Sequence, residues 1–161
     1  MEVNERELYP QYYGFWKSEN SESTFFLWID DGVERSKGLV LDRLGFAEVS
    51  GFSLNPQGVR FDKNYTKLSE NSALKKIVRY EGVRVVPSKG LFNGQWHIWR
   101  ARKGGKNDRS GSFYMQAYPE PEDDPILNHM VREACREAVT RYSHQLGLDL
   151  QFVPKELLPT G

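Results

Sequence analysis

The side chains that most often carry chemistry are few in this chain. The three histidines are His97, His129 and His144, and the single cysteine is Cys135. Two metal ligands on one helix usually lie three or four residues apart, so the wide separation of His129 and His144 predicts no shared metal site. Cys135 falls within an apolar helical stripe, where a thiol acts as a small hydrophobic residue. A nucleophilic thiol would need an accessible, electropositive setting and a neighbouring base.

Two pairs of adjacent carboxylates, Asp30-Asp31 and Asp123-Asp124, could bind a cation or share a proton. Local structure accounts for both pairs. The first precedes Gly32 in a turn, and in the second Asp124 is suited to cap a helix that begins at Pro125. We therefore predict no metal site at either pair.

The basic segment around Gly104-Gly105 comes nearest to a phosphate-binding loop. Lys103, Lys106 and Arg109 surround the glycines, but no helix follows to supply a dipole and a row of backbone N–H groups. The segment is typical of a hairpin tip. Because no acid, base and nucleophile converge in the sequence, we predict no catalytic residue and no cofactor, and we rank an enzyme behind the binding functions.

Aromatic residues make up 13% of the chain, and their bulk must fill a core or line a pocket. A ring can stack on a sugar or a planar ligand, and an amide beside it can supply a hydrogen bond. The candidate ligand-binding residues are Trp28, Trp96, Tyr114 and Gln116. The alternative is that the rings belong to the core, as aromatic residues that alternate along strands usually do.

Residues 89–118 carry the longest alternating pattern and predict a β-hairpin with strands at 91–102 and 110–118. Side chains alternate between the two faces of a strand. In the first strand one face holds Phe92, Trp96 and Ile98, and the other holds Asn93, Gln95, His97 and Trp99. Both faces carry an aromatic ring, so either could point inward. If Trp96 points inward, His97 and Trp99 are surface residues.

Six further segments have the alternation or the β-branched content of strands: 12–17, 24–29, 37–42, 46–54, 59–65 and 76–86. Gly51 predicts a bulge, Gly82 leaves the last segment as one kinked strand or two short ones, and 67–74 fits a helical turn or a loop equally. The connections are too short for crossover helices, so consecutive strands should pair antiparallel. The predicted fold class is mainly β, an antiparallel meander of about eight strands closed into a barrel with one C-terminal α-helix packed against it.

The C-terminal helix is predicted over 123–147, because apolar residues recur at helical spacing from Ile126 to Leu146 and Gly147 is a natural stop. The helix should lie against the outside of the sheet or close one barrel end, and its apolar face could instead serve a partner helix. Residues 148–153 alternate like a short strand. At 161 residues we expect a single domain, 1–161, with the barrel at 12–118 and flexible ends at 1–10 and 154–161.

Composition narrows the partners and the compartment. Lys and Arg balance Asp and Glu at 22 each, so no net field attracts nucleic acid or an anionic membrane, and we predict neither as a partner. No apolar run has the length of a secretory leader or of a transmembrane helix. One cysteine forms no internal disulfide, which fits a reducing compartment. These features predict a soluble, cytoplasmic protein.

The run Gly14-Phe15-Trp16-Lys17 on the first strand resembles the G-x-W start of the calycin barrels, the lipocalins and fatty-acid-binding proteins. A helix after the last barrel strand is similar to the lipocalin order, and the run continuing to Ser23-Thr24-Phe25 is similar to the first hairpin of avidin. The chain lacks the lipocalin cysteines and leader, and the helix pair of fatty-acid-binding proteins. The resemblance implies a barrel in which Trp16 plugs one end, and it implies no particular ligand.

The first functional hypothesis is a non-enzymatic barrel that binds a small, partly apolar ligand. An interior solidly filled by side chains would argue against it. The alternative is a structural or regulatory protein-interaction module that uses the C-terminal helix or an aromatic sheet face, and self-association fits that second hypothesis.

Overall fold

The computed structural model describes residues 9–29, 37–69, 77–86, 90–100 and 110–141, without the side chains of 65–69, 86, 99 and 100. These ranges form eight strands, a 3-10 turn and an α-helix. The elements are β1 (Tyr12–Lys17), β2 (Glu22–Ile29), β3 (Gly38–Asp42), β4 (Gly45–Leu54), β5 (Gly58–Ser69), β6 (Ile77–Val86), β7 (Leu91–Arg100), β8 (Ser110–Ala117), η3 (Pro121–Asp123) and α2 (Pro125–Arg141).

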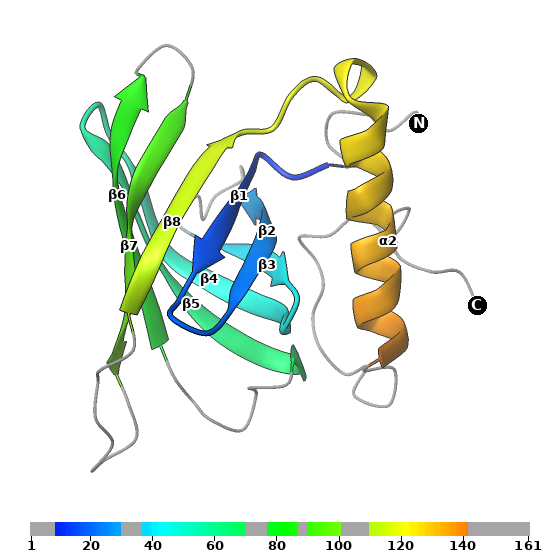
Figure 1. The fold of residues 1–161 in the computed structure, drawn as a ribbon, viewed down its shortest axis with the longest axis horizontal. Coiled ribbons are helices and arrows are strands. Elements are labelled where there is room, and N and C mark those ends of the chain that lie inside the picture. The colour runs from blue at the N-terminus through cyan, green and yellow to red at the C-terminus, as the bar shows by residue number, and fades with distance from the viewer. Residues whose placement is uncertain (1–8, 30–36, 70–76, 87–89, 101–109, 142–161) are drawn as a thin grey trace.

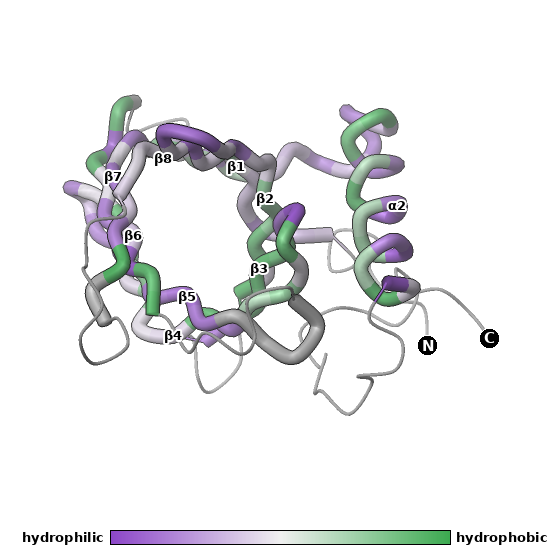
Figure 2. The backbone as a smooth tube through the Cα atoms, turned by 60° about the horizontal axis from the view of Figure 1, so that its bottom comes forward, coloured by the Kyte–Doolittle hydropathy of each residue, from purple (hydrophilic) through white to green (hydrophobic). Residues whose placement is uncertain are grey.

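The strands form a closed antiparallel barrel. Each strand pairs with the next along the chain, and β8 returns to pair with β1. Figure 2 shows the resulting ring, with α2 standing beside β2 and β3. Each of the eight described strands thus has a neighbour on both sides, so the barrel lacks the free outer strands of an open sheet, which are templates for edge-to-edge aggregation. The predicted eight-stranded meander barrel with one C-terminal helix is confirmed.

The β1–β2 end of the barrel carries two tight connections, the turn 18–21 after β1 and the turn 43–44 after β3. In the second, the backbone N–H of Leu44 donates to Asp42 Oδ1 at 2.9 Å. Gly45 follows with φ of 114°, a conformation that favours glycine. The sequence Asp-Arg-Leu-Gly therefore has both the side-chain acceptor and the permissive residue that this turn needs.

Strand boundaries differ from the predicted ranges where pairing extends them. β2 begins two residues early, at Glu22, because Lys17 on β1 pairs with it. β5 continues to Ser69, which pairs with Gly45, so the first part of 67–74 is strand. The bulge expected at Gly51 is present: its φ is 63° and the β4–β5 register shifts between Ser50 and Ser53.

Gly82 does not divide β6, which is one continuous strand. It pairs with Val59 on β5 and with Gly94 on β7. A Cβ atom added to Gly82 would lie 3.0 Å from Cζ of Phe113. The glycine therefore leaves room for an interior ring.

Helix α2 begins where the capping chemistry predicts. The N–H of Leu127 donates to Asp124 Oδ1 at 2.9 Å, and the N–H of Asn128 donates to the Asp124 carbonyl at 3.1 Å. The turn η3 directly precedes it. The rest of the predicted helix, 142–147, and the predicted strand 148–153 lie outside the described residues.

The helix lies against the outer face of the wall formed by the first strands (Figures 1 and 2). Its buried residues are Leu127, Asn128, Val131, Cys135, Ala138 and Val139. All of them except Asn128 share one hydrophobic cluster with outward residues of β2, β3 and β4, namely Phe26, Trp28, Leu39, Leu41 and Phe46. The helix therefore covers a barrel wall instead of closing an end, and the wall beneath it is apolar on both faces.

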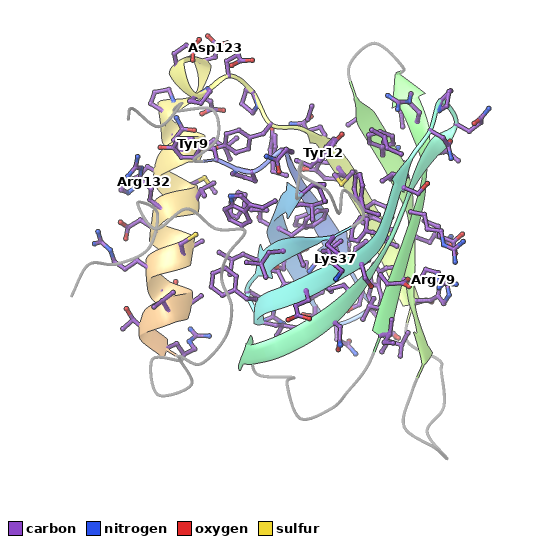
Figure 3. All side chains as sticks on the ribbon, turned by 180° about the vertical axis from the view of Figure 1, so that it is seen from behind. Tyr9, Tyr12, Lys37, Arg79, Asp123 and Arg132 are labelled. Carbon is purple, nitrogen blue, oxygen red and sulfur yellow. The ribbon has the colours of Figure 1, made fainter. Side chains whose placement is uncertain are left out.

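Tyr9 joins the N-terminal segment to this helix–wall layer. Its ring stacks on Tyr118 with centroids 5.8 Å apart, and its hydroxyl accepts a hydrogen bond of 2.9 Å from Nε of Arg132. Figure 3 shows Tyr9 reaching α2 beside Arg132. The end of the 1–10 segment is thus docked under the helix, and Tyr9 is buried.

Candidate functional site

The centre of the barrel is occupied by aromatic rings. Phe61 stacks on Tyr80 with centroids 4.7 Å apart, and Tyr80 meets Phe113 edge-on at 5.0 Å and Phe25 at 6.1 Å. All four side chains are buried. Gly14 makes space for the Phe25 ring, since an added Cβ would come within 2.9 Å of two of its atoms. Close packing of this kind leaves the centre of the barrel filled by side chains.

Two tryptophans pack together near the β1–β2 end of the interior. Trp16 meets Trp96 edge-on with centroids 6.1 Å apart, and both are buried. The indole N–H of Trp96 donates to the carbonyl of Lys17 at 3.1 Å. Trp16 thus lies in the interior beside the β1–β2 turn, where the resemblance to calycin barrels implies an end plug.

A buried polar cluster connects this tryptophan layer to the central rings. Lys63 Nζ lies 3.0 Å from Asp42 Oδ2 and donates to the Tyr80 hydroxyl at 2.9 Å. Asp42 Oδ2 also accepts the indole N–H of Trp16 at 3.2 Å. The side chains of Lys63 and Asp42 are only 3% and 0% exposed. With so little exposure, neither charged group can meet a ligand directly, and the pair joins β3 to β5 through the interior.

Burial raises the pKa of Tyr80 above its usual value, and the nearby Lys63 ammonium opposes that shift only in part. The phenol therefore stays neutral at physiological pH, and its oxygen accepts the hydrogen bond from the Lys63 ammonium. Lys63 also lies 5.5 Å from the centroid of the Trp16 ring and 5.0 Å from that of Tyr80. These ring faces further stabilise the ammonium away from water.

A cleft with a volume of about 500 Å³ lies between α2 and the outer wall near the β1–β2 end. That size falls within the range of small-molecule sites. From the barrel its lining residues are Ser23, Thr24, Phe26, Leu41, Asp42, Arg43 and Gly45, and from the helix Met130, Ala134, Glu137, Ala138 and Arg141. Two of the helix residues that line the cleft, Ala134 and Ala138, have small side chains.

The cleft changes character along its length. Phe26 and Leu41, which pair across β2 and β3, lie farther from the β1–β2 end than the polar lining residues of the same strands. The helix runs toward the same end, so Met130 and Ala134 precede Glu137 and Arg141 in the same direction (Figure 1). The apolar parts of both walls therefore face each other deeper along the helix, and the polar parts meet at the β1–β2 end.

The charged side chains at the polar end differ in whether they form an ion pair. Arg141 Nη2 lies 2.9 Å from Glu137 Oε1, and this ion pair joins residues one helical turn apart. Asp42 pairs with Lys63 in the interior. Arg43 donates through Nη2 to the Ser21 hydroxyl, and no carboxylate among the described residues lies within ion-pair distance of it.

The structure does not bring the four sequence-predicted binding residues into one site. Trp96 points into the barrel, whereas Trp28 lies on the outer face of the wall in the layer beneath α2. Tyr114 is 44% exposed and stacks on Phe15 outside the barrel, and Gln116 donates to the Tyr13 hydroxyl on the same outer face. The indole N–H of Trp28 is buried without a hydrogen-bond partner in the described part of the chain.

The cleft and the buried ion pair went unpredicted, but one signal was present for the pair. Lys63 alternates with Val59 and Phe61 on the apolar side of its strand. A lysine in that register is buried, and a buried lysine requires an acidic partner. No comparable local signal exists for the cleft, because its two walls lie about a hundred residues apart in the chain.

The residues considered for metal or anion binding lie apart from the cleft or outside the described residues. His97 is half-buried on the face opposite Trp96, and His129 is exposed on α2. His144, the Asp30-Asp31 pair and the Gly104-Gly105 segment lie outside the described residues. Within the described ranges no three His, Cys, Asp or Glu side chains gather in a way that could hold a metal ion, and no helix is long and apolar enough to cross a membrane.

Cys135 is buried in the layer between helix and wall, and burial raises its pKa to about 12. The thiol of the folded protein therefore stays protonated at pH 8. We expect a chromogenic disulfide reagent to leave Cys135 unmodified in the native protein and to modify it completely in urea. Modification of the native protein within seconds would contradict this burial.

Comparison with known proteins finds no family model, no curated protein and no solved structure that matches the chain.

Proposed function

We propose that this protein is a non-enzymatic binding protein whose cleft between α2 and the barrel wall takes one small amphipathic molecule. One observation carries the proposal: a cleft of about 500 Å³ has an apolar half and a polar half in a fixed order. A ligand with an apolar body and a polar head would bury the body against Met130 and Ala134 of α2, beside the buried side chains of Phe26 and Leu41. Its head would then lie among the polar groups at the β1–β2 end.

The central barrel is the less suitable place for the ligand. A molecule there would have to displace the stacked rings of Phe61 and Tyr80 or break the Lys63–Asp42 pair. Either change sacrifices close packing or leaves a buried charge without its partner. The helix–wall cleft requires neither, which is why the proposal places the ligand outside the barrel while keeping the barrel as its scaffold.

Filling the cleft tests the proposal. The neutral dye phenylnaphthylamine should bind with one saturable site and gain fluorescence, because its rings would leave water for the apolar half. Ala134→Trp places an indole in the cleft wall and should weaken dye binding about tenfold or more by occupying the same space. A fluorescence titration measures both affinities.

Thr140→Trp is the matched control, since it adds the same ring to an exposed position of α2 that does not line the cleft. It should leave dye affinity unchanged. Urea midpoints of both variants show whether the helix still docks. If the dye fails to bind, or binds the folded Ala134→Trp variant as tightly as the parent, the cleft is not the ligand site.

A further inference from the structure

We infer that the head group of the ligand is an anion and that Arg43 receives it. This inference rests on the proposed function, and it names the ligand's chemical class: an amphipathic organic anion with an apolar body. The guanidinium stands at the polar end of the cleft, on the tight turn between β3 and β4.

The turn holds Arg43 in place at two points. Its backbone N–H donates to the Ser23 hydroxyl at 3.0 Å, and its Nη2 donates to the Ser21 hydroxyl. Both serines belong to the neighbouring β1–β2 region, so the backbone and the guanidinium of Arg43 are each tied to that region at the polar end of the cleft. A guanidinium has five N–H donors, and a neutral hydroxyl uses one of them.

The charge balance of the cleft favours an anion. Among the residues that the structure describes, three cationic side chains, Lys63, Arg43 and Arg141, lie in or directly behind the polar end, against the two carboxylates of Asp42 and Glu137. Each carboxylate has a cation within ion-pair distance, and neither lies at such a distance from Arg43. The surplus positive charge therefore resides on Arg43.

Two features oppose an anion, and neither outweighs Arg43. The C-terminal end of α2 carries partial negative charge, but Arg141 stands in its last turn and offsets it. Arg43 is exposed, so water and salt screen its charge. A charge-assisted, forked hydrogen bond remains favourable under these conditions, though its contribution is modest.

Two dyes of nearly the same shape test the inference. Anilinonaphthalene sulfonate carries an anionic group that phenylnaphthylamine lacks. Arg43→Gln should weaken binding of the sulfonate about five- to tenfold and leave the neutral dye unaffected. Arg43→Lys keeps the charge but loses the planar fork, so the sulfonate affinity of this variant should lie between that of the parent and that of Arg43→Gln. Sulfonate affinity of the parent should decrease with added salt, and this dependence should flatten in Arg43→Gln.

Arg136→Gln is the control for charge removal, because Arg136 lies on the exposed face of α2 and does not line the cleft. It should change neither affinity. Equal sulfonate binding by Arg43→Gln and the parent, with the neutral dye still excluded by Ala134→Trp, would overturn the anionic head group and keep the cleft. Loss of the Ala134→Trp effect on the neutral dye would instead overturn the proposed function itself.

Discussion

Asp42→Asn should lower the free energy of unfolding by about 3–5 kcal/mol, measured by urea denaturation at neutral pH. The substitution keeps the size of the side chain and removes its charge. Lys63 would then hold a positive charge in the barrel interior without its carboxylate, with the neutral Tyr80 hydroxyl as an acceptor at 2.9 Å. Removing one partner of a buried ion pair is more damaging than removing both, because the remaining charge is desolvated without compensation.

Removal of the other partner of the ion pair, Lys63, should lower stability less. Lys63→Met leaves the Asp42 carboxylate buried, but the indole N–H of Trp16 and the backbone N–H of Leu44 still donate to it at 3.2 and 2.9 Å. These two donors stabilise the anion after the lysine is removed. We expect the double variant Asp42→Asn with Lys63→Met to be more stable than Asp42→Asn alone.

Arg79 and Asp62 provide the matched control, since their side chains form an ion pair of 2.8 Å that also starts from β5, here to β6, but are each 21% exposed. Asp62→Asn should lower stability by only about 1 kcal/mol or less. If Asp42→Asn were no more damaging than Asp62→Asn, the interior pair would not be the desolvated cluster that the structure shows.

The order of the strands could be predicted because the signals that set it are local. Alternation marks each strand, and turn residues such as Asp42 and Gly45 mark the reversals between them. Short connections then require antiparallel neighbours, and a meander of this length hides its edges by closing. The helix start followed from Asp124 and Pro125 in the same way.

Which face points inward could not be predicted from these signals. Trp96 and Trp28 both stand on strands with aromatic residues, yet Trp96 is inside the barrel and Trp28 is beneath α2. A wall covered by a helix is apolar on both faces, so the usual contrast between a core face and a solvent face disappears there. The cleft depends on how the helix sits against that wall, and side-chain alternation carries no information about it.

Phe61→Ala should lower the free energy of unfolding by about 3–5 kcal/mol and create an apolar cavity inside the barrel. Phe61 is 1% exposed, stacks on Tyr80 at 4.7 Å and also contacts the rings of Phe52 and Phe113 at 6.1 and 6.5 Å. Removing the ring deletes contacts on several sides, and a barrel with all strands paired has little freedom to collapse into the space. A cavity lined by rings stays dry and accepts small apolar molecules such as benzene.

Benzene should therefore raise the melting temperature of Phe61→Ala, because it binds the folded state alone. Phe15→Ala is the control: it makes the same change on the outer face of β1, where Phe15 is half-buried and stacks on Tyr114 at 6.0 Å. It should lower stability less and gain nothing from benzene. If benzene stabilised the parent as strongly as Phe61→Ala, even with the cleft filled by Ala134→Trp, the barrel would already contain a cavity. The ligand would then belong inside the barrel, and the filled centre that directs it to the helix–wall cleft would be wrong.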